Sequence, residues 1–599
     1  MHTQSKLALF LSSCLFFTGC GSSGSASAPV DVNPSSPADG NTDVPTPPST
    51  PDTSTPDAPS VSSDLIKLNQ VGYLPLALKS ALVPDVAATQ FELINQNGAV
   101  AFTGALSAAS HWQPSGSIKY KLADFSDFTA TGVYRVKVAG IADSSAFSIN
   151  SDLYQSLSDQ ALKAFYYNRS SHSILASHGG DWVRTAGHAD TNVIVHASAA
   201  TNERPAGSII SSSKGWYDAG DYGKYVVNSG IATYTLLAAY EHYDDFFTNR
   251  DINIPESGNT VPDILDEVKW NLDWLQTMQD NDGGVYHKLT TLGWPGIEMP
   301  AADQRARYVI GKSTAATLDF AAVLAQASRV YKPFYPELSA QWLTAAQNAW
   351  AWAVANPNVV YQQPSDVESG EYGDNFFQDE FRWAATELYI TTANSQYLEA
   401  INRNATDISA PSWGYVAGLS YITLANQSKT DFDINAIDAA GHAIVGLAET
   451  YYQQYTDSAF LIPMIESDFV WGSNATALNK AIILLQAYQL TNEIKFKHAA
   501  LGLADYILGR NPTGYSFVTG VGERSPLNIH HRVSAADTIN APIPGLLAGG
   551  PHNGQQDGCR YDSNAPALTY LDDWCSFSTN EVAINWNAPL VYVLAALAR

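Results

Sequence analysis

The chain has 599 residues, of which 45% are hydrophobic and 15% charged, so it is long enough for more than one buried core and too poor in charge to be disordered throughout. Its formal net charge is −26, from 32 basic and 58 acidic residues. This excess repels phosphate and argues against a nucleic-acid partner. The 14 Trp, 31 Tyr and 22 Phe only hint at a glycan partner, because large domains also use aromatic residues as core.

Residues 1–19 are predicted to be a signal peptide. Lys6 precedes a mostly apolar stretch, Leu7–Phe17, which is too short and too early for a membrane-spanning helix. The stretch ends in Phe17-Thr18-Gly19-Cys20, which resembles the bacterial lipobox. By that resemblance Cys20 becomes the lipidated first residue of the mature protein, the alternative being an ordinary secretory signal with a chance cysteine. No later apolar run reaches 18 residues, so we expect membrane contact through the lipid anchor only.

Residues 20–63 are predicted to form a flexible linker rich in Pro, Ser and Thr. The part from Gly21 to Ser63 holds nine of the 30 Pro and no aromatic residue, so it cannot bury enough apolar surface to offset its ordering entropy. Such a tether, stiffened by Pro, would hold the folded part away from the membrane. Since Gly21 gives no inner-membrane retention signal, we expect an exported protein that is lipid-anchored to the bacterial cell envelope, at the outer membrane or the cell surface.

From residue 64 to 150 the hydrophobic pattern has a period of two, which predicts short strands. Phe91–Ile94 runs into Asn97-Gly98, the strongest short hairpin signal, and Val133–Val138 alternates apolar and basic residues. Short strands separated by turns over this length are typical of a β-sandwich. No cluster of titratable residues occurs here, so we expect a structural or substrate-shaping module.

From residue 151 to 599 the period changes to 3.6, which predicts a mainly α domain. Asp263–Gln279 carries one apolar stripe, begins beside Pro262 and stops before Gly283-Gly284. An α/α toroid is the natural architecture for so many antiparallel helices around one core. Similar stretches are Leu153–Tyr167, Ile231–Phe247, Ser313–Tyr331, Leu338–Val354, Glu380–Thr391, Trp413–Ala425, Ala436–Tyr455, Ala475–Leu490, Lys495–Leu508 and Asn587–Leu597.

Two loop segments concentrate acidic and aromatic residues. In the first, Asp218 and Asp221 are separated by Ala-Gly, and these small residues let the backbone turn tightly enough for both carboxylates to face one cavity. Such a pair can position and deprotonate a water molecule. The alternative is that both residues cap the following helix. In the second segment Glu581 stands among apolar and aromatic residues, which favours the raised pKa of a general acid, although Glu is also common at helix starts.

Cys559 and Cys575 lie just upstream of Glu581. In an exported protein these two cysteines can pair and staple the loop before Glu581, and closing 16 residues would contribute about 3 kcal/mol in the chain-entropy model. Two reduced thiols are the alternative. A third cluster, His530-His531-Arg532, lacks the spacing of a zinc site, so we interpret it as donors that orient sugar hydroxyls or a catalytic carboxylate, against the alternative of a solvated charged loop.

These segments together resemble glycoside hydrolase family 9, from about residue 65 to the C-terminus. The Asp-Ala-Gly-Asp block at 218–221, the His-x-Arg block at 530–532 and the block at 580–589 occur in the family's order, and the ordered set is highly specific. Further similar segments are Gly284–Lys288 and Asp379–Leu388, and Asn69–Tyr73 is similar to the start of the immunoglobulin-like module found ahead of many members. The resemblance implies an (α/α)6 barrel preceded by a small immunoglobulin-like β-sandwich.

The resemblance also implies roles for residues at the matching positions. Asp221 would be the general base, Asp218 its partner in holding the water, and Glu581 the general acid that protonates the leaving oxygen. The family's mechanism is inverting, which requires a carboxyl gap of roughly 6.5–9.5 Å between acid and base. The predicted substrate-binding residues are His530, Arg532, Trp586 (where the family often has Tyr), His287 and Trp413, the last of which is equally compatible with a core role.

The metal predictions come from the same resemblance to the family. Some relatives bind zinc through Cys and His before the Asp-Ala-Gly-Asp block, but the matching stretch Thr185–Asp190 has no Cys, so we predict no zinc. A structural calcium held by Asp379 and Glu380 is one interpretation of these residues, and a salt-bridged helix face is the other. The chemistry itself requires no cofactor.

The sequence therefore predicts a surface-anchored, monomeric, inverting hydrolase that cleaves β-1,4-glucosidic bonds in cellulose or related β-glucans, as an endoglucanase does. Within the same family the alternatives are an exo-acting cellobiosidase or glucosidase, a xyloglucanase and an exo-glucosaminidase. A non-catalytic glycan-binding lipoprotein is the alternative from another class. The presence of Asp218, Asp221 and Glu581 together favours an enzyme.

Overall fold

The structure is a computed structural model that describes residues 65–599. The predicted signal peptide, linker and lipidation site at Cys20 lie outside the described residues. Across residues 65–599 none of the helices combines the length and the apolar character needed to cross a membrane.

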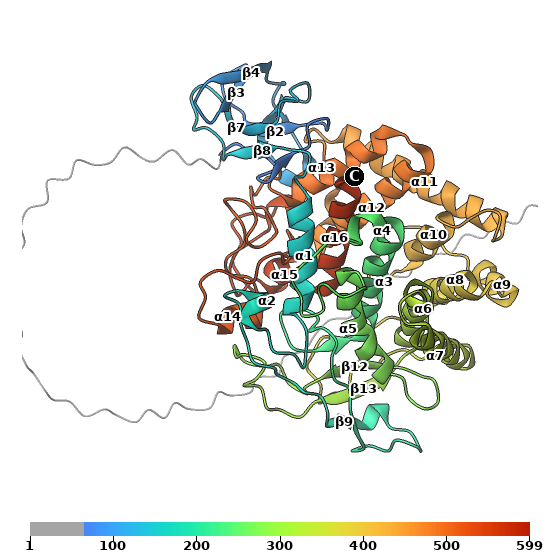
Figure 1. The fold of residues 1–599 in the computed structure, drawn as a ribbon. Helices are drawn as coiled ribbons and strands as arrows, with labels where there is room; N and C mark the ends of the chain where they lie inside the picture. Colours follow the sequence, from blue (N-terminus) through green and yellow to red (C-terminus); the bar gives the residue numbers. More distant parts are fainter. Residues whose placement is uncertain (1–64) are drawn as a thin grey trace, which may run out of the picture. The chain divides into compact units, whose positions relative to one another are not determined.

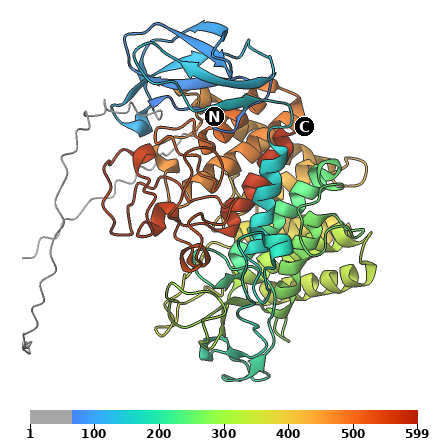
Figure 2. The same cartoon turned by 60° about the vertical axis from the view of Figure 1, so that its left-hand side comes forward.

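The N-terminal module consists of two β-sheets (Figure 2). Asn97-Gly98 forms the turn between β3 and β4, where Gly98 has a φ of 75° that glycine adopts without strain. The first sheet has the strand order β1-β8-β7-β3-β4 and the second β2-β6-β5. The strands are β1(Gly72–Tyr73), β2(Ser80–Pro84), β3(Gln90–Asn95), β4(Val100–Ala105), β5(Ser110–His111), β6(Lys119–Asp124), β7(Gly132–Lys137) and β8(Phe147–Ile149).

The core of this module follows from the period-two pattern. Phe91 and Leu93 are buried while Glu92 between them faces outward and pairs with Lys137 on the neighbouring strand. Tyr73 packs edge-on against Phe125 with ring centroids 5.2 Å apart. Alternate residues of a strand point to opposite faces, so one face of each sheet is buried and the other is solvated.

The rest of the chain is mainly helical (Figure 1). The predicted helices are present, with shifted ends. The long helices are α1(Gln155–Tyr167), α3(Val226–His242), α5(Asp263–Thr277), α6(Thr314–Tyr331), α7(Pro336–Ala355), α8(Gln378–Thr392), α9(Ser395–Arg403), α10(Ala417–Ala425), α11(Ile434–Asp457), α12(Ser473–Thr491), α13(Ile494–Ile507) and α16(Ile584–Leu597). The short ones are α2(Ala176–Gly179), α4(Asp244–Phe247), α14(Arg532–Ala536) and α15(Phe577–Asn580).

The helices fall into two groups by burial and packing. α3, α6, α12 and α16 are buried on nearly all sides, whereas α11 buries only one stripe. Together with the mostly buried α8 and α10, these four helices form the first group, in which neighbours pack in the order α16, α3, α6, α8 and α10, and α12 packs against α16. The Asn426 side chain, just after α10, donates to Gln486 on α12. The remaining helices α1, α5, α7, α9, α11 and α13 pack against the outside of this group.

Two features of the helical domain were not predicted. The helix α9 was missed, and so was a five-stranded sheet of order β10-β9-β13-β12-β11. Its strands are only two to five residues long and lie between Gly- and aromatic-rich loops, so they leave almost no periodic signal: β9(Val193–Val195), β10(Ile209–Ile210), β11(Lys224–Tyr225), β12(Tyr286–Thr290) and β13(Tyr308–Lys312). The pairing of β11 with β12 places Tyr225 opposite Lys288.

The Asn69–Tyr73 stretch joins the module to the helical domain. The Asn69 amide donates to Asp505 on α13 at 2.9 Å, and its oxygen accepts the backbone N–H groups of Val71 and Gly72. The Gln70 amide donates to the carbonyl of Gly514 at 2.9 Å. This contact explains why two polar residues stand at the entrance of a β-module.

Candidate active site

Asp218 lies at the centre of the site and is fully buried. Asn228, in the first turn of α3, donates to both carboxylate oxygens at 3.1 and 3.0 Å, and the Tyr372 hydroxyl donates to Oδ2 at 3.0 Å. Burial, together with the charge of Asp221, raises the pKa of Asp218 to about 7. Asp218 is thus held in one orientation by donors on two separate elements.

Asp221 is held by its own loop. Its Oδ2 accepts hydrogen bonds from the Gly223 N–H and the Tyr225 hydroxyl, each at 3.1 Å. Neither Asp218 nor Asp221 caps α3, because the residue before that helix is Tyr225 and no side chain caps its start. The capping alternative is wrong, and both carboxylates are available to the site.

Glu581 approaches this loop from the other end of the chain. The Gly220 N–H donates to Glu581 Oε1 at 3.3 Å, and the backbone beside Glu581 pairs with that of His530. Burial, followed by the negative charge of Asp221, raises the pKa of Glu581 to about 8. Glu581 therefore carries a proton at neutral pH, which is the state a general acid needs.

Gly220 allows the two halves of the site to meet. A Cβ atom at this position would lie 2.2 Å from the carbonyl oxygen of His530 and 3.1 Å from Glu581 Oε1. Any larger residue would push the loop of Asp218 and Asp221 away from Glu581. The small Ala-Gly pair in the first motif is therefore required by close approach of the two loops as well as by the turn.

His530 and Arg532 lie at this junction. The His530 ring stacks on Trp574, with centroids 4.2 Å apart, and its Nδ1 lies 2.8 Å from the Trp574 carbonyl oxygen. Arg532 donates to the carbonyl oxygens of Gly220 at 2.9 Å and Pro295 at 3.1 Å. In this structure Arg532 therefore orients the catalytic loop through its backbone, and His530 stands beside Glu581.

The other three predicted substrate-binding residues differ in their surroundings. His287 is fully buried, with Nδ1 2.9 Å from Ser313 Oγ and Nε2 3.0 Å from the Glu371 carbonyl oxygen, so it supports the loop that carries Tyr372 instead of facing the solvent. Trp586 is 9% exposed and packs closely against Gly472. Trp413 is half-buried and packs edge-on against Tyr372, with centroids 5.2 Å apart, which brings it next to Asp218.

Tyr372 is the site residue that sequence reasoning missed. Besides its bond to Asp218, its ring packs against Tyr225 at 4.7 Å, and its backbone has a φ of 48°, which is uncommon for a residue with a side chain. Lys288 holds the same loop, donating to the Gly370 carbonyl oxygen at 2.7 Å. The available signal was an aromatic residue between two glycines, Gly370-Glu371-Tyr372-Gly373, in a loop before a helix.

Replacing Tyr372 by Phe is expected to lower kcat by about 10-fold to 100-fold with little change in KM, because it removes one of the two donors to the buried Oδ2 of Asp218 and leaves only Asn228 to orient that oxygen. The lost donor also raises the pKa of Asp218, so the acidic limb of the pH–kcat profile should move to higher pH. Tyr415→Phe is the control, since the Tyr415 hydroxyl donates to the backbone carbonyl oxygen of Asp407 and, among the described hydrogen bonds, to no catalytic carboxylate. Equal kcat values for the two variants would contradict a role for Tyr372 in holding Asp218.

Cys559 and Cys575 are joined by a disulfide in the structure. Just outside the loop that it closes, Asp557 on one side accepts the hydroxyl of Ser578 on the other at 2.6 Å, and Ser578 lies three residues before Glu581. The disulfide thus lies in the chain segment that leads to Glu581, the predicted general acid.

In the double variant Cys559→Ser, Cys575→Ser the free energy of unfolding is expected to be lower by about 3 kcal/mol, because the unfolded chain gains entropy when the loop is no longer closed. Chemical denaturation measured with and without reductant checks this. Reductant should destabilise the parent and leave the double variant unchanged. A parent that is insensitive to reductant would contradict the stabilising role.

Asp379 and Glu380, the predicted calcium ligands, lie at the start of α8 and are both buried. Asp379 Oδ1, Glu380 Oε2 and one carboxylate oxygen each of Asp319 and Asp374 have no hydrogen-bond partner. Within residues 65–599, however, no three His, Cys, Asp or Glu side chains converge as metal ligands. The alternative of a salt-bridged helix face is wrong for Asp379 and Glu380, because none of the described ion pairs involves either residue.

The stretch Thr185–Asp190, for which no zinc was predicted, contains His188. Its ring contacts Asp303 at 3.4 Å and the Tyr217 hydroxyl at 2.8 Å.

A protonated glutamic acid that meets, across one glycine, a loop carrying two aspartates supplies the acid and the base that a glycoside hydrolase needs. The comparisons with known proteins agree with this class. The family model "Glycosyl hydrolase family 9" matches residues 154–594, and "Cellulase N-terminal ig-like domain" matches residues 62–143. The protein therefore belongs to glycoside hydrolase family 9 and carries the immunoglobulin-like module of cellulases.

Three similar proteins illustrate the relationship. A xyloglucan-specific endo-β-1,4-glucanase of Bacteroides ovatus is 42% identical, over 90% of this chain and 94% of its own. Endoglucanase C of Cellulomonas fimi is 35% identical, over 89% of this chain and 52% of its own. The solved structure of a Bacteroides ovatus family 9 protein has a TM-score of 0.84 at 40% identity, covering 90% of this chain and 99% of its own. The similarity thus extends over both the module and the helical domain.

Proposed function

We propose that this glycoside hydrolase is an inverting, endo-acting β-1,4-glucanase. The observation that carries the proposal is the placement of Glu581, whose pKa is raised to about 8, next to the Gly220 N–H of the loop that holds Asp218 and Asp221. The substrate class is supported by two relatives that are named as β-1,4-glucanase and endoglucanase.

Each catalytic residue has one step in this mechanism. Glu581 gives its proton to the glycosidic oxygen as the bond to the anomeric carbon breaks. Asp221 takes a proton from a water that Asp218 helps to hold, and this water attacks the anomeric carbon from the opposite face. The product sugar has inverted configuration, and this mechanism requires a separation of roughly 6.5–9.5 Å between the carboxyl groups of the acid and the base, which leaves room for the water.

A xyloglucanase is the second candidate, because the relative that is 42% identical is named as specific for xyloglucan. The two candidates differ in the room needed beside the glucan backbone for xylose branches. An exo-acting mode also has a relative behind it, because a protein named as a cellulose 1,4-β-cellobiosidase is 32% identical over 89% of this chain. The glucosaminidase alternative lacks such an observation.

The architecture that we infer around the site is an (α/α)6 barrel. The packing order of α16, α3, α6, α8, α10 and α12 supports an inner ring, and α1, α5, α7, α9, α11 and α13 an outer ring. This alternation of inner and outer helices along the chain is that of stacked helical hairpins.

We also propose that the enzyme is a monomer, exported and held at the bacterial cell envelope through lipidated Cys20. The lipobox-like Phe17–Cys20 and the Pro-rich segment after it support this location. A structural calcium beside Asp379 and Glu380 is supported by their unpaired buried oxygens, with backbone carbonyls or waters as further ligands.

The experiment that tests the function is hydrolysis of a glycan panel by the lipid-free protein. The panel contains carboxymethylcellulose, mixed-linkage glucan, xyloglucan, cello-oligosaccharides and chito-oligosaccharides. We expect cleavage of the β-glucans with a ladder of internal products, and the ratio of xyloglucan to carboxymethylcellulose turnover separates the two candidates. Cleavage of chito-oligosaccharides alone would contradict the substrate, and binding without turnover would favour the glycan-binding lipoprotein.

The pH dependence follows from the acid. A carboxyl pKa raised to about 8 keeps Glu581 protonated below that pH, so kcat is expected to fall as the pH rises through about 8. Initial rates on a soluble β-glucan between about pH 3 and pH 10 measure this limb. An alkaline limb near the ordinary glutamate pKa, about 4.3, would contradict the assignment.

A further inference from the structure

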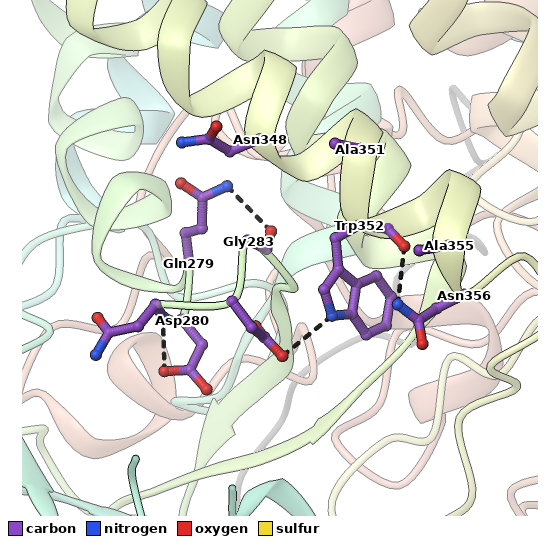
Figure 3. Close-up of a pocket in the computed structure, with 10 residues that line it drawn as sticks. Gln279, Asp280, Gly283, Asn348, Ala351, Trp352, Ala355 and Asn356 are labelled. Carbon is purple, nitrogen blue, oxygen red and sulfur yellow. Dashed lines mark hydrogen bonds between the residues drawn. The ribbon is translucent and has the colours of Figure 1, made fainter. Parts of the chain in front are cut away.

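A cavity of about 590 Å³, away from the catalytic residues, lies between α7 and the turn that connects α5 to β12 (Figure 3). None of the catalytic residues lines it. The lining residues come from that turn and from one face of the C-terminal half of α7: Gln279, Asp280, Asn281, Asp282 and Gly283, and Asn348, Ala351, Trp352, Ala355 and Asn356.

One wall of this cavity is the indole of Trp352, which the turn holds in place. Its Nε1 donates to Asp282 Oδ2 at 3.1 Å (Figure 3). At Gly284 a Cβ atom would lie 2.5 Å from the indole Cε2, so the ring packs directly on the glycine backbone. The indole is therefore a fixed, preformed surface, and such surfaces suit the C–H faces of sugar rings.

The charges around the cavity are already paired. Lys312 contacts Asp280 at 2.6 Å and Asp282 at 2.8 Å, and Arg204 contacts Asp280 at 3.1 Å. The lining contains no Lys, Arg or His. A cation would find both carboxylates neutralised, and an anion would find no unpaired positive group, so the cavity suits a neutral ligand.

The remaining polar groups are amides. Asn348 is exposed, and in the part of the chain that the structure describes no hydrogen bond is formed by its side chain. Asn281 accepts from Arg204 through its oxygen, which leaves its NH₂ group available. The Asn356 NH₂ donates to the Trp352 carbonyl oxygen, which leaves its own oxygen as an acceptor. Amide donors and acceptors beside one aromatic wall match the hydroxyl groups of a sugar.

We propose that this cavity is a second carbohydrate-binding site, which takes a neutral sugar unit of the β-glucan away from the catalytic carboxylates. The identity of the glycan rests on the proposed function. Such a site would hold a polymer chain on the enzyme between cleavage events and would contribute little to the turnover of short substrates.

The test counts binding sites by calorimetry in the inactive Glu581→Gln protein, with cellohexaose as the probe. We expect two sites, and one site when Ala351→Arg is added, because Ala351 is an exposed cavity residue whose enlargement blocks the space. Ala340→Arg is the matched control: Ala340 is also exposed on α7, about 16 Å away along the helix, and lies outside the cavity lining. It should keep two sites.

A second readout uses active protein. Ala351→Arg should leave kcat/KM for cellotetraose within about twofold and lower the rate on insoluble or long-chain glucan several-fold, whereas Ala340→Arg should change neither. One site in Glu581→Gln, or two sites in Glu581→Gln with Ala351→Arg, would overturn the proposal. If one of these two results came with normal β-glucan turnover by the parent, the second site would be refuted and the hydrolase function would stand. If the parent turned over no β-glucan at all, the proposed function would fail, and with it the identification of the glucan as the ligand.

Discussion

Replacing Glu581 by Gln is expected to lower kcat on a cello-oligosaccharide by about 10²–10⁴-fold, because an amide has no proton to give to the leaving oxygen. KM should change little, since Gln has nearly the same shape and keeps an oxygen that can accept the Gly220 N–H. The effect should depend on the leaving group. With a dinitrophenyl cellobioside, whose leaving group departs without protonation, the variant should recover most of the parent rate.

Glu493→Gln provides the control for this experiment, because Glu493 is an exposed carboxylate that pairs with Lys495. Its activity should equal that of the parent on both substrates. If Glu581→Gln lost the same factor on the activated and the natural substrate, the loss would come from a disturbed site, and the general-acid assignment would be wrong.

Replacing Asp221 by Asn is expected to lower kcat by about 10²–10⁴-fold on both kinds of substrate, because the attacking water loses its base whatever the leaving group. The Gly223 N–H and the Tyr225 hydroxyl that now donate to Asp221 can still reach an amide oxygen, so the loop should keep its conformation. Azide needs no deprotonation and is small enough to take the place of the water. It should restore part of the rate on the activated cellobioside and yield the inverted α-glycosyl azide.

The decisive measurement for inversion is the anomer of the sugar that the parent enzyme first releases, read as the anomeric proton coupling by NMR. An α product is expected from the β-linked substrate, and a β product would indicate a retaining enzyme and contradict the mechanism. Asp431→Asn, an exposed aspartate in the loop between α10 and α11, is the control and should show neither the loss nor the rescue.

Local sequence predicted most of the elements, and the errors have physical causes. The helix α3 was expected from Ile231 but begins at Val226, and it includes Gly230 at a point where a Cβ would lie 3.0 Å from Asp319 on α6. Similarly, Pro589 lies within α16, which was expected only from Asn587. In both cases close packing between helices outweighs the intrinsic preference of one residue.

The three catalytic residues could be predicted from the sequence because each of their motifs is local. Asp218 and Asp221 lie three residues apart, and Glu581 stands in an apolar segment of its own. The supporting residues were not visible, since Tyr372 and Lys288 gain their roles only from contacts with loops far away in the chain. The burial of His287 likewise depends on its stacking against Tyr361, with ring centroids 3.9 Å apart.

The sequence by itself determined the order of the two folded parts, the helical period and the acidic residues available for catalysis, because these depend on neighbours a few positions away. The apolar neighbours of Glu581 already favoured a raised pKa, but only the tertiary structure decided how far it is raised. Gly220 and Glu581 are 361 residues apart and meet at 3.3 Å, and the resulting burial beside Asp221 turns an ordinary glutamate into an acid with a pKa of about 8. Burial between distant loops and the nearby charge of Asp221 are properties of the assembled site, and neighbours in sequence do not specify them.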